Sequence, residues 1–456
     1  MPNILAYGVL LAWPLAVFLL LKKYPVKQAI LYSVVLSALL LPTMVIDPPL
    51  LPPLNRSSLT SLALLSSLFL LGKRFRFFES GVTTTLVLLY CFGVFMTAEL
   101  NGVAVLSGGM LLPGLSHYDA LTSVLKTLLF LVPFLLGRYF FKDISDNKMV
   151  FKFLTLTALF YSILMLFEVR MSPQLHYWIY GFFPTSFIQQ VRAGGFRPSV
   201  FIGHGLPLAF WFSTCVMAAA VLHKNKVRCS VLSPTAVVCY MLVVLLLCKT
   251  VSALLYAGFA LTLIYNFSPK RQVKWVLLLS LTIMVYPLNN ILGLFPVTEL
   301  INFIEILSPE RAQSLEFRFQ NEDALLSRAM ERPFFGWGDW GRNRVYSEFG
   351  KDTSVTDGKW ILELGTHGFI GFFMYYSLLI TPLFYANKAI RYIKEKNQQY
   401  YFATLAIILV ISLIDSVPNT NMGSIQFLLA GALLGQSERL LKGKVFQDNA
   451  NKGKVV

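Results

Sequence analysis

Residues 4–27 read ILAYGVLLAWPLAVFLLLKKYPVK, an apolar run over 4–21 followed by Lys22, Lys23 and Lys27. About 20 apolar residues in a helix span the hydrocarbon core of a bilayer, and lysines beside such a helix mark its cytoplasmic end. No basic segment precedes the run and no small-residue cleavage site ends it, so we expect a retained helix and not a signal peptide. This stretch predicts a membrane protein.

The same pattern fills the chain. Of its 456 residues, 56% are hydrophobic and only 14% are charged, against about 25% charged in ordinary soluble domains. We therefore predict one all-α polytopic membrane protein with about 12–13 transmembrane helices, the last three following a large loop over 296–360. The expected spans are 4–21, 28–46, 58–71, 82–98, 120–136, 149–168, 199–222, 231–247, 251–267, 273–295, 361–386, 400–415 and 422–440.

Basic residues are concentrated in alternate loops. The chain has 39 Lys and Arg against 23 Asp and Glu, a formal charge of +16. Because the excess lies in short loops beside apolar runs, it indicates cytoplasmic loops and not nucleic-acid binding. The other loops, which include 99–119, 169–198 and 296–360, should face the opposite side. The N-terminus is then expected outside and the C-terminus inside.

The sequence contains none of the usual metal or nucleotide motifs. The five cysteines lie in or beside apolar segments without CxxC or Cys/His spacing, which disfavours a disulfide framework or a zinc site. Phosphate-binding loops, dinucleotide fingerprints, HExxH, GxSxG and Asp-x-Asp pairs are also missing. We expect no metal and no cofactor, and both ATP-driven transport and nucleotide-sugar chemistry are disfavoured.

Two outer loops, 169–198 and 296–360, are longer than simple connectors, and such long loops are commonly functional. Within the second, apolar residues at helical spacing predict a helix from Glu310 to Glu331. Arg332 and Pro333 should end it, since the residue before proline avoids helical geometry. Residues 447–456 are expected to form a disordered cytoplasmic tail.

The first candidate site combines residues 191–198, VRAGGFRP, with Lys249 in a very short outer loop. Arg192 and Arg197 beside two glycines suit a diphosphate, because guanidinium groups bind phosphate oxygens in pairs and exposed backbone amides form anion nests. Composition alone favours interfacial anchoring as the explanation of these arginines. Lys249 is either a functional cation at membrane depth or simply a polar residue of the short loop between two apolar helices.

The large loop holds further candidates. Arg311, Arg318 and Glu322 are expected near one helical face, although Arg318 and Glu322 also have the spacing of a surface ion pair. The stretch 332–344, RPFFGWGDWGRNR, places Trp337, Trp340 and Arg342 among glycines. Such a surface suits stacking of sugar rings, or else interfacial anchoring.

Asp357 directly precedes a predicted span and has two readings: a general base for a hydroxyl, or the N-cap of that helix. Spacing alone favours the cap. His204 is the histidine nearest the Arg192 and Arg197 pair, and His367 lies in a later span; most such histidines are structural.

In this order, the features resemble the O-antigen ligase and polymerase superfamily of bacterial polytopic membrane proteins. The resemblance covers roughly residues 150–435. It rests on 192–198, on 249–252, on Arg318 with 336–338 in the large loop, and on Asp357 leading into 363–371, ELGTHGFIG. It divides the chain into N-terminal helices over 1–148, a ligase/polymerase-like core over 149–446, and the tail.

The resemblance implies a metal-independent glycosyltransferase of the bacterial inner membrane, with its site facing the periplasm. Its substrate would be an undecaprenyl-diphosphate-linked glycan, transferred with inversion at the anomeric carbon. The implied partners are membrane lipids, a chain-length regulator and a flippase. Arginines would hold the diphosphate, with these residues as candidates: Arg192, Arg197, Lys249, Arg311 and Arg318.

The chain departs from the ligase pattern at two positions. Ligases carry Arg where Lys249 stands here, and a His where Asp357 stands. We therefore expect a polymerase of O-antigen or exopolysaccharide repeat units, with Asp357 ahead of His204 and Glu322 as the base. A ligase acting on lipid A core is the alternative, and a lipid-linked glycan flippase is the alternative from another class.

Overall fold

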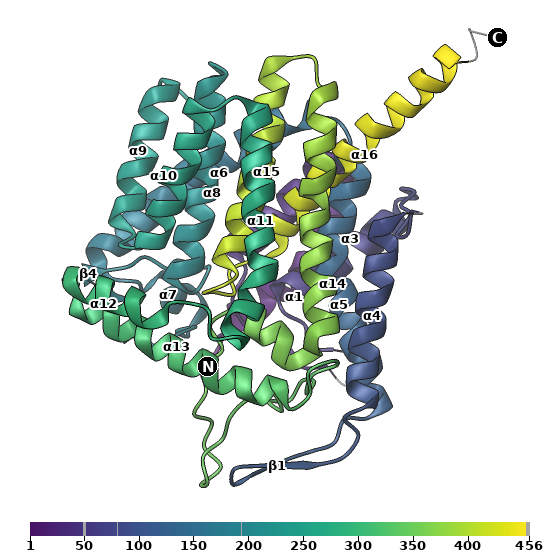
Figure 1. Cartoon of the computed structure of the whole chain (residues 1–456). Helices are drawn as coiled ribbons and strands as arrows, with labels where there is room; N and C mark the ends of the chain where they lie inside the picture. The colour runs from purple at the N-terminus through teal and green to yellow at the C-terminus, as the bar shows by residue number, and fades with distance from the viewer. Residues whose placement is uncertain (49–51, 80, 193, 453–456) are drawn as a thin grey trace.

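The structure is a computed structural model and describes residues 1–48, 52–79, 81–192 and 194–452. Every span expected from the sequence is a helix, and the chain is an all-α polytopic membrane protein (Figure 1). The helices at the expected spans are α1 (Ile4–Lys23), α2 (Val26–Leu40), α3 (Arg56–Leu70), α4 (Val82–Glu99), α5 (His117–Phe140), α6 (Asp146–Met171), α8 (Gly205–Lys224), α9 (Pro234–Leu247), α10 (Val251–Asn266), α11 (Pro269–Ile291), α14 (Lys359–Ala389), α15 (Lys396–Asp415) and α16 (Ser424–Lys452).

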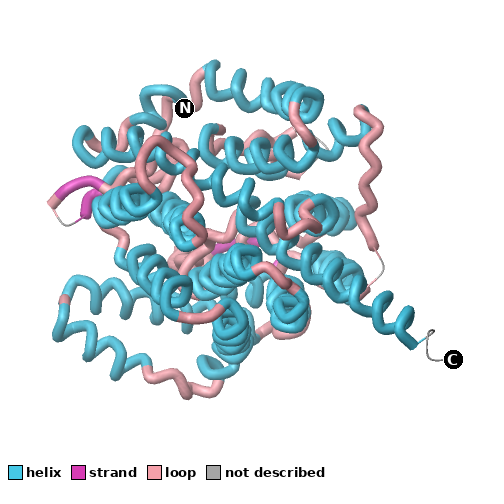
Figure 2. Tube along the Cα trace, turned by 90° about the horizontal axis from the view of Figure 1, so that it is seen from above, coloured by secondary structure: helices cyan, strands magenta, loops and turns pink. Residues whose placement is uncertain are grey.

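Within the described residues, eight helices are long and apolar enough to cross a membrane: α1, α4, α5, α6, α8, α11, α14 with its short extension η2 (Ile390–Tyr392), and α15. Four others, α2, α3, α9 and α10, are apolar but shorter. Seen from above in Figure 2, many helices are viewed nearly end-on, so they form one bundle of roughly parallel rods. The tail expected to be disordered from Gln447 is instead helical to Lys452, as the end of α16.

The short elements gather at one end of the bundle, together with the N-terminus (Figure 1). They include two amphipathic helices that lie across this end, α12 (Val297–Leu307) and α13 (Pro309–Met330). Helix α13 confirms the helix expected before Pro333. The predicted outer loops therefore share one end. The elements are β1 (Val105–Ser107), β2 (Met110–Leu112), α7 (Leu175–Tyr180), η1 (Phe187–Gln190), β3 (Val191–Arg192), β4 (Gly195–Phe196), α12 (Val297–Leu307) and α13 (Pro309–Met330).

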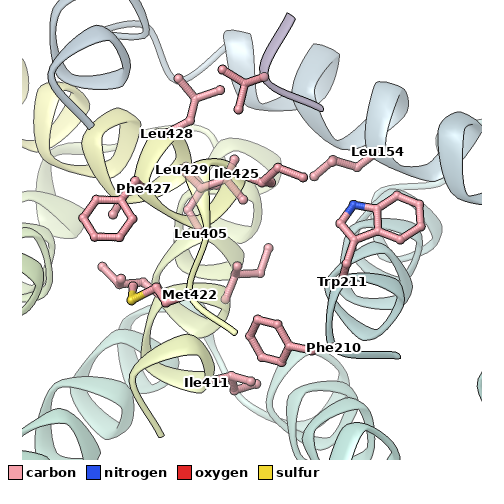
Figure 3. Close-up of a cluster of buried hydrophobic side chains, with 14 of the residues drawn as sticks. Leu154, Phe210, Trp211, Leu405, Ile411, Met422, Ile425, Phe427, Leu428 and Leu429 are labelled. Atoms are coloured by element: carbon pink, nitrogen blue, oxygen red, sulfur yellow. The ribbon is translucent and has the colours of Figure 1, made fainter. Parts of the chain in front are cut away.

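Small residues let α5 and α16 cross in close contact. A Cβ on Gly137 would lie 2.2 Å from the carbonyl oxygen of Leu428, and one on Gly431 would lie 1.9 Å from that of Phe134. Such contacts are typical of helix pairs in membranes, where close backbone packing replaces hydrophobic burial as the driving force. Residues on both sides of position 148 consequently share one apolar core, part of which is drawn in Figure 3.

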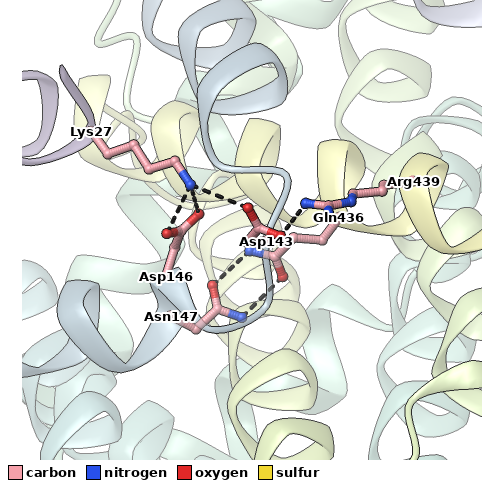
Figure 4. Close-up of polar contacts among 6 residues, drawn as sticks. All are labelled: Lys27, Asp143, Asp146, Asn147, Gln436 and Arg439. Carbon is pink, nitrogen blue, oxygen red and sulfur yellow. Dashed lines mark hydrogen bonds and ion pairs between the residues drawn. The ribbon is translucent and has the colours of Figure 1, made fainter. Parts of the chain in front are cut away.

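A polar cluster holds the opposite end of the bundle together (Figure 4). Lys27 Nζ lies 2.7 Å from Asp146 Oδ2 and 3.4 Å from Asp143 Oδ2, and Arg439 pairs with Asp143. Beside them, the side-chain amides of Asn147 and Gln436 exchange two hydrogen bonds; both residues are buried. These contacts join α2, α6 and α16 at the end that carries the basic loops.

Helix α14 is broken at Gly368, whose φ of 65° lies in the left-handed region. Its freed backbone groups pair with residues 333–338: Phe369 N donates to Pro333 O at 2.7 Å, and Trp337 N to Gly365 O at 2.9 Å. Broken helices are tolerated at membrane depth when other protein groups satisfy the backbone in this way. A Cβ on Gly368 would lie 2.3 Å from the carbonyl oxygen of Phe334, so the approach requires glycine. Gly336 is required for the same reason, because a Cβ there would lie 2.5 Å from the carbonyl oxygen of Thr366.

Candidate functional site

Arg197 and Lys249 are tied together at the end of the bundle that holds α13. Arg197 Nη2 donates to the carbonyl oxygen of Lys249 at 3.4 Å, and Lys249 Nζ donates to that of Arg192 at 3.1 Å. Lys249 adopts a φ of 51° at the turn between α9 and α10. The structure thus brings together the two loops that the sequence singled out; Ala193, between the two strands, lies outside the described residues.

Glycines make room for these two cations. A Cβ on Gly205 would lie 2.0 Å from Arg197 Cδ, and one on Gly195 would lie 2.4 Å from Lys249 Nζ. Side chains at either position would have to displace a cation. The glycines at the start of α8 and in β4 therefore shape the site.

Arg197 is 7% exposed, and its Nε has no hydrogen-bond partner among the described residues. Burial, followed by repulsion from Arg192, lowers the pKa of Arg197 to about 10. The guanidinium is still protonated at neutral pH. A buried charged donor without a partner is costly unless a ligand satisfies it, so Arg197 is suited to an anion.

Arg318 reaches the same region from α13. Its Nε lies 3.4 Å from Asp357 Oδ2, and it acts electrostatically on Arg197. The expectation that Asp357 caps the following helix is wrong: Gly358 is the N-cap of α14, and no side chain bonds the cap. Arg318 pairs with Asp357, not with Glu322, because α13 lies against the segment before α14.

His204 is the N-cap of α8. Its Nδ1 accepts a hydrogen bond from Leu206 N at 3.0 Å, so in the neutral ring Nε2 carries the proton. Burial and the nearby Arg197 lower the pKa of His204, which Asp357 partly opposes. A neutral ring with a protonated Nε2 donates a hydrogen bond and does not take up a proton there. The geometry therefore argues against His204 as the base.

Glu322 lies beside the Arg318 and Asp357 pair, in a cavity of about 100 Å³. Its carboxylate accepts hydrogen bonds from Trp360 Nε1 at 2.5 Å and from Tyr286 OH at 3.1 Å. Burial raises the pKa of Glu322 to about 7 in spite of these donors. Both carboxylates that the sequence proposed as bases thus line one cavity with Arg318.

Asp415 is a component that sequence reasoning missed. It lies at the end of α15, only 1% exposed, and its Oδ1 accepts from Asn419 Nδ2 at 2.9 Å. Its Oδ2 has no hydrogen-bond partner among the described residues, while Arg318 acts on it electrostatically. An acidic residue at the end of an apolar span is itself a signal of function, and that signal was present in the sequence.

Four predicted site residues, Arg311, Trp337, Trp340 and Arg342, lie outside the cluster. Arg311 is exposed on α13, two turns before Arg318, roughly 10 Å along the axis. Trp337 is 4% exposed and its ring is covered by the guanidinium carbons of Arg328 and Arg332, at 3.5 and 4.5 Å from its centroid. It has no free face for a sugar.

Arg342 is likewise structural. It is fully buried and donates to the carbonyl oxygens of Pro113, Trp337 and Val103, at 2.6, 3.2 and 3.2 Å. These bonds fasten the β1–β2 loop to the large loop and leave no donor for a sugar. Trp340 differs, since it is 66% exposed with its Nε1 bonded to Asp119 on α5.

The fold and this cluster define a polytopic α-helical membrane protein with a cationic site at one end of its bundle. No protein-family model matches the chain, and no match is found among curated proteins. Among the residues described, no three His, Cys, Asp or Glu side chains are grouped to hold a metal ion.

Proposed function

We propose that the protein is a glycosyltransferase that polymerises undecaprenyl-diphosphate-linked repeat units of O-antigen or exopolysaccharide. The observation that carries the proposal is the gathering of Arg197, Lys249 and Arg318 in one cluster, in which Arg318 pairs with Asp357 and acts on Asp415. Cations that attract a diphosphate and carboxylates that accept a proton are the two parts this reaction needs. The site would face the periplasm from a bacterial inner membrane, because the basic loops lie at the other end.

In this mechanism the acceptor hydroxyl oxygen bonds to the anomeric carbon of the donor while the bond from that carbon to the diphosphate breaks. Undecaprenyl diphosphate leaves with the bonding electrons, and the proton of the hydroxyl passes to Asp357. Arg197 and Arg318 stabilise the charge that develops on the leaving group, the kind of electrostatic assistance that commonly gives the largest catalytic effect. In this mechanism Nε2 of His204 would donate a hydrogen bond to the diphosphate, since Nδ1 is occupied by Leu206 N.

A ligase that transfers the finished glycan to lipid A core is the second candidate, since it would use the same cationic site and differ only in its acceptor. A flippase is less favoured. Passage of a diphosphate across the bilayer would call for cations along its whole path, whereas the cluster lies at one end of the bundle. A chain-length regulator and a flippase would act as partners of the polymerase.

The test is to incubate the purified protein with the lipid-linked repeat unit alone and to separate the products on a gel. A ladder spaced by one repeat, formed by the wild type and by Arg311→Ala but not by Arg318→Ala, supports the proposal. Arg311 is the matched control, because it lies exposed on the same helix. A ladder that survives both Arg197→Ala and Arg318→Ala refutes the mechanism. Transfer only after lipid A core is added indicates a ligase.

A further inference from the structure

A second cavity, of about 480 Å³, lies on the other side of the first half of α14. It is formed by the beginnings of α3, α5 and α14 together with α4, at the same end of the bundle as the cationic cluster. Its volume is within the range of roughly 300–1,000 Å³ that is usual for small-molecule sites. None of the residues assigned above to diphosphate binding or catalysis lines it.

Helix α14 separates the two cavities. Gly358 and Ile361 line the small cavity with Arg318 and Asp357, whereas Lys359, Leu362, Glu363, Thr366 and His367 line the large one. At 100° per residue these two sets lie on different faces of the helix, centred roughly 140° apart. The helix therefore presents one face to each cavity, and Asp357 lies just before its first residue.

The charges in the large cavity are paired. Lys359 Nζ lies 2.5 Å from Glu363 Oε1, and Lys126 Nζ lies 3.2 Å from Asp339 Oδ2. Glu363 also contacts His367 Nδ1 at 3.1 Å. Two lysines thus balance two carboxylates, so these four side chains carry no net formal charge.

The cationic cluster is different in charge. It contains four cations, Arg192, Arg197, Lys249 and Arg318, against three acidic side chains, Asp357, Asp415 and Glu322. The excess positive charge suits a diphosphate, while a neutral lining does not discriminate in favour of an anion. The cationic cluster and the large cavity are therefore suited to different parts of a substrate.

The rest of the lining includes hydroxyl groups and aromatic rings, among them those of Ser57, Ser123, Thr127, Phe130 and Tyr90, beside the apolar side chains of Val45, Pro53 and Leu362. Hydroxyls both donate and accept, which matches a polyhydroxylated ligand. The exposed ring of Trp340 follows directly after Asp339 in the chain and adds a surface for stacking.

We infer that the 480 Å³ cavity binds neutral sugar rings of the acceptor glycan, on the opposite side of α14 from the donor diphosphate. The inference rests on the proposed function and deepens it. A glycan that leaves the cavity over the start of α14 brings its terminal hydroxyl toward Asp357. Helix α14 would then position the donor diphosphate and the acceptor glycan relative to each other.

The first test is direct binding of neutral disaccharides to the whole protein in lipid nanodiscs, measured by saturation-transfer NMR. The probes are maltose, cellobiose, lactose and diacetylchitobiose, with glucose 1-phosphate as the anionic comparison. Thr127→Phe places a ring in the cavity, and Thr122→Phe makes the same change on α5 at a position that does not line it. Ser123→Leu is a second filling variant if Thr127→Phe does not fold.

We expect at least one disaccharide to bind to the wild type and to Thr122→Phe, with at least fivefold weaker binding to Thr127→Phe or Ser123→Leu. No binding by any of the four, equal binding by the filling variants, or preference for glucose 1-phosphate overturns the inference.

A second readout separates this inference from the proposed function. In the ladder assay, Thr127→Phe should raise the KM for an oligosaccharide acceptor at least fivefold while undecaprenyl diphosphate still binds. A ladder with an unchanged acceptor KM refutes the cavity's role and leaves the polymerase standing. Disaccharide binding that depends on Thr127, in a protein that forms no product, refutes the polymerase and keeps the sugar site.

Discussion

The Nε atom of Arg318 lies 3.4 Å from Oδ2 of Asp357, and this ion pair joins α13 to the segment before α14. Both side chains are more than one-third exposed, so the pair itself contributes little to stability. The ion pair instead fixes positions: it holds the guanidinium of Arg318, on α13, and the carboxylate of Asp357, just before α14, in one site.

Arg318→Ala should weaken the binding of undecaprenyl diphosphate about tenfold or more, because a hydrogen bond to a charged group contributes roughly 1.5–3 kcal/mol. Arg311→Ala should leave it unchanged. Binding can be measured by titration in detergent, with thermal melting to confirm that both variants are folded. Equal loss in the two variants would mean that α13 attracts the ligand only through its general charge.

Asp357→Asn should reduce polymer formation by about 10²–10⁴-fold, the usual contribution of a general base, while diphosphate binding persists. Asp415→Asn should reduce it less, since one oxygen of Asp415 is already bonded to Asn419. Initial rates of ladder formation compare the two. The opposite order would transfer the role of base to Asp415.

Glu322 should make thermal stability depend on pH. Because its pKa is raised from 4.5 to about 7 in the folded protein, the protonated carboxyl stabilises the fold fully below pH 4.5, and this stabilisation is lost as the pH rises through about 7. The loss is of the order of 3 kcal/mol. The Tm of the wild type should therefore fall relative to that of Glu322→Gln between pH 5 and 8. Parallel curves would contradict the prediction.

Gly368→Ala should lower the Tm and the yield of folded protein strongly, since the added methyl group would lie 2.3 Å from a backbone carbonyl and φ is positive. Gly258→Ala is the matched control within α10, where a Cβ meets nothing within 4 Å. It should be neutral or slightly stabilising. If both variants melt alike, the break in α14 does not depend on this contact.

Trp337→Ala should affect stability, whereas Trp340→Ala should affect disaccharide binding. Trp337 is buried under two arginines, and its loss should destabilise the protein by about 3–5 kcal/mol. Trp340 is exposed, so its loss should leave the Tm unchanged and weaken disaccharide binding. Melting curves and saturation-transfer NMR on the same preparations test both parts. A stable Trp337→Ala would contradict the buried arrangement.

Much of the fold follows from local pattern. Each apolar run became a helix because a backbone in hydrocarbon must satisfy its own hydrogen bonds, and α13 ends where Pro333 required it. The clustering of Arg197, Lys249 and Arg318 was also anticipated, because all three lie in loops expected on one side. The roles of Trp337 and Arg342 were not, since neither residue type nor spacing reports which side chain becomes buried.

Hydropathy and charge act locally along the chain, so they predict the all-α membrane class, the positions of the helices and the end of the bundle at which the cations gather. Other features emerge only from the packed helices: the partner of Arg318, the capping role of His204, the inclusion of Asp415 and the cavity beside Glu363. These depend on how distant helices pack. At Gly368 the loop segment 333–338 packs directly against α14. No local sequence pattern specifies this contact, because the two segments are brought together only by the packing of the whole chain.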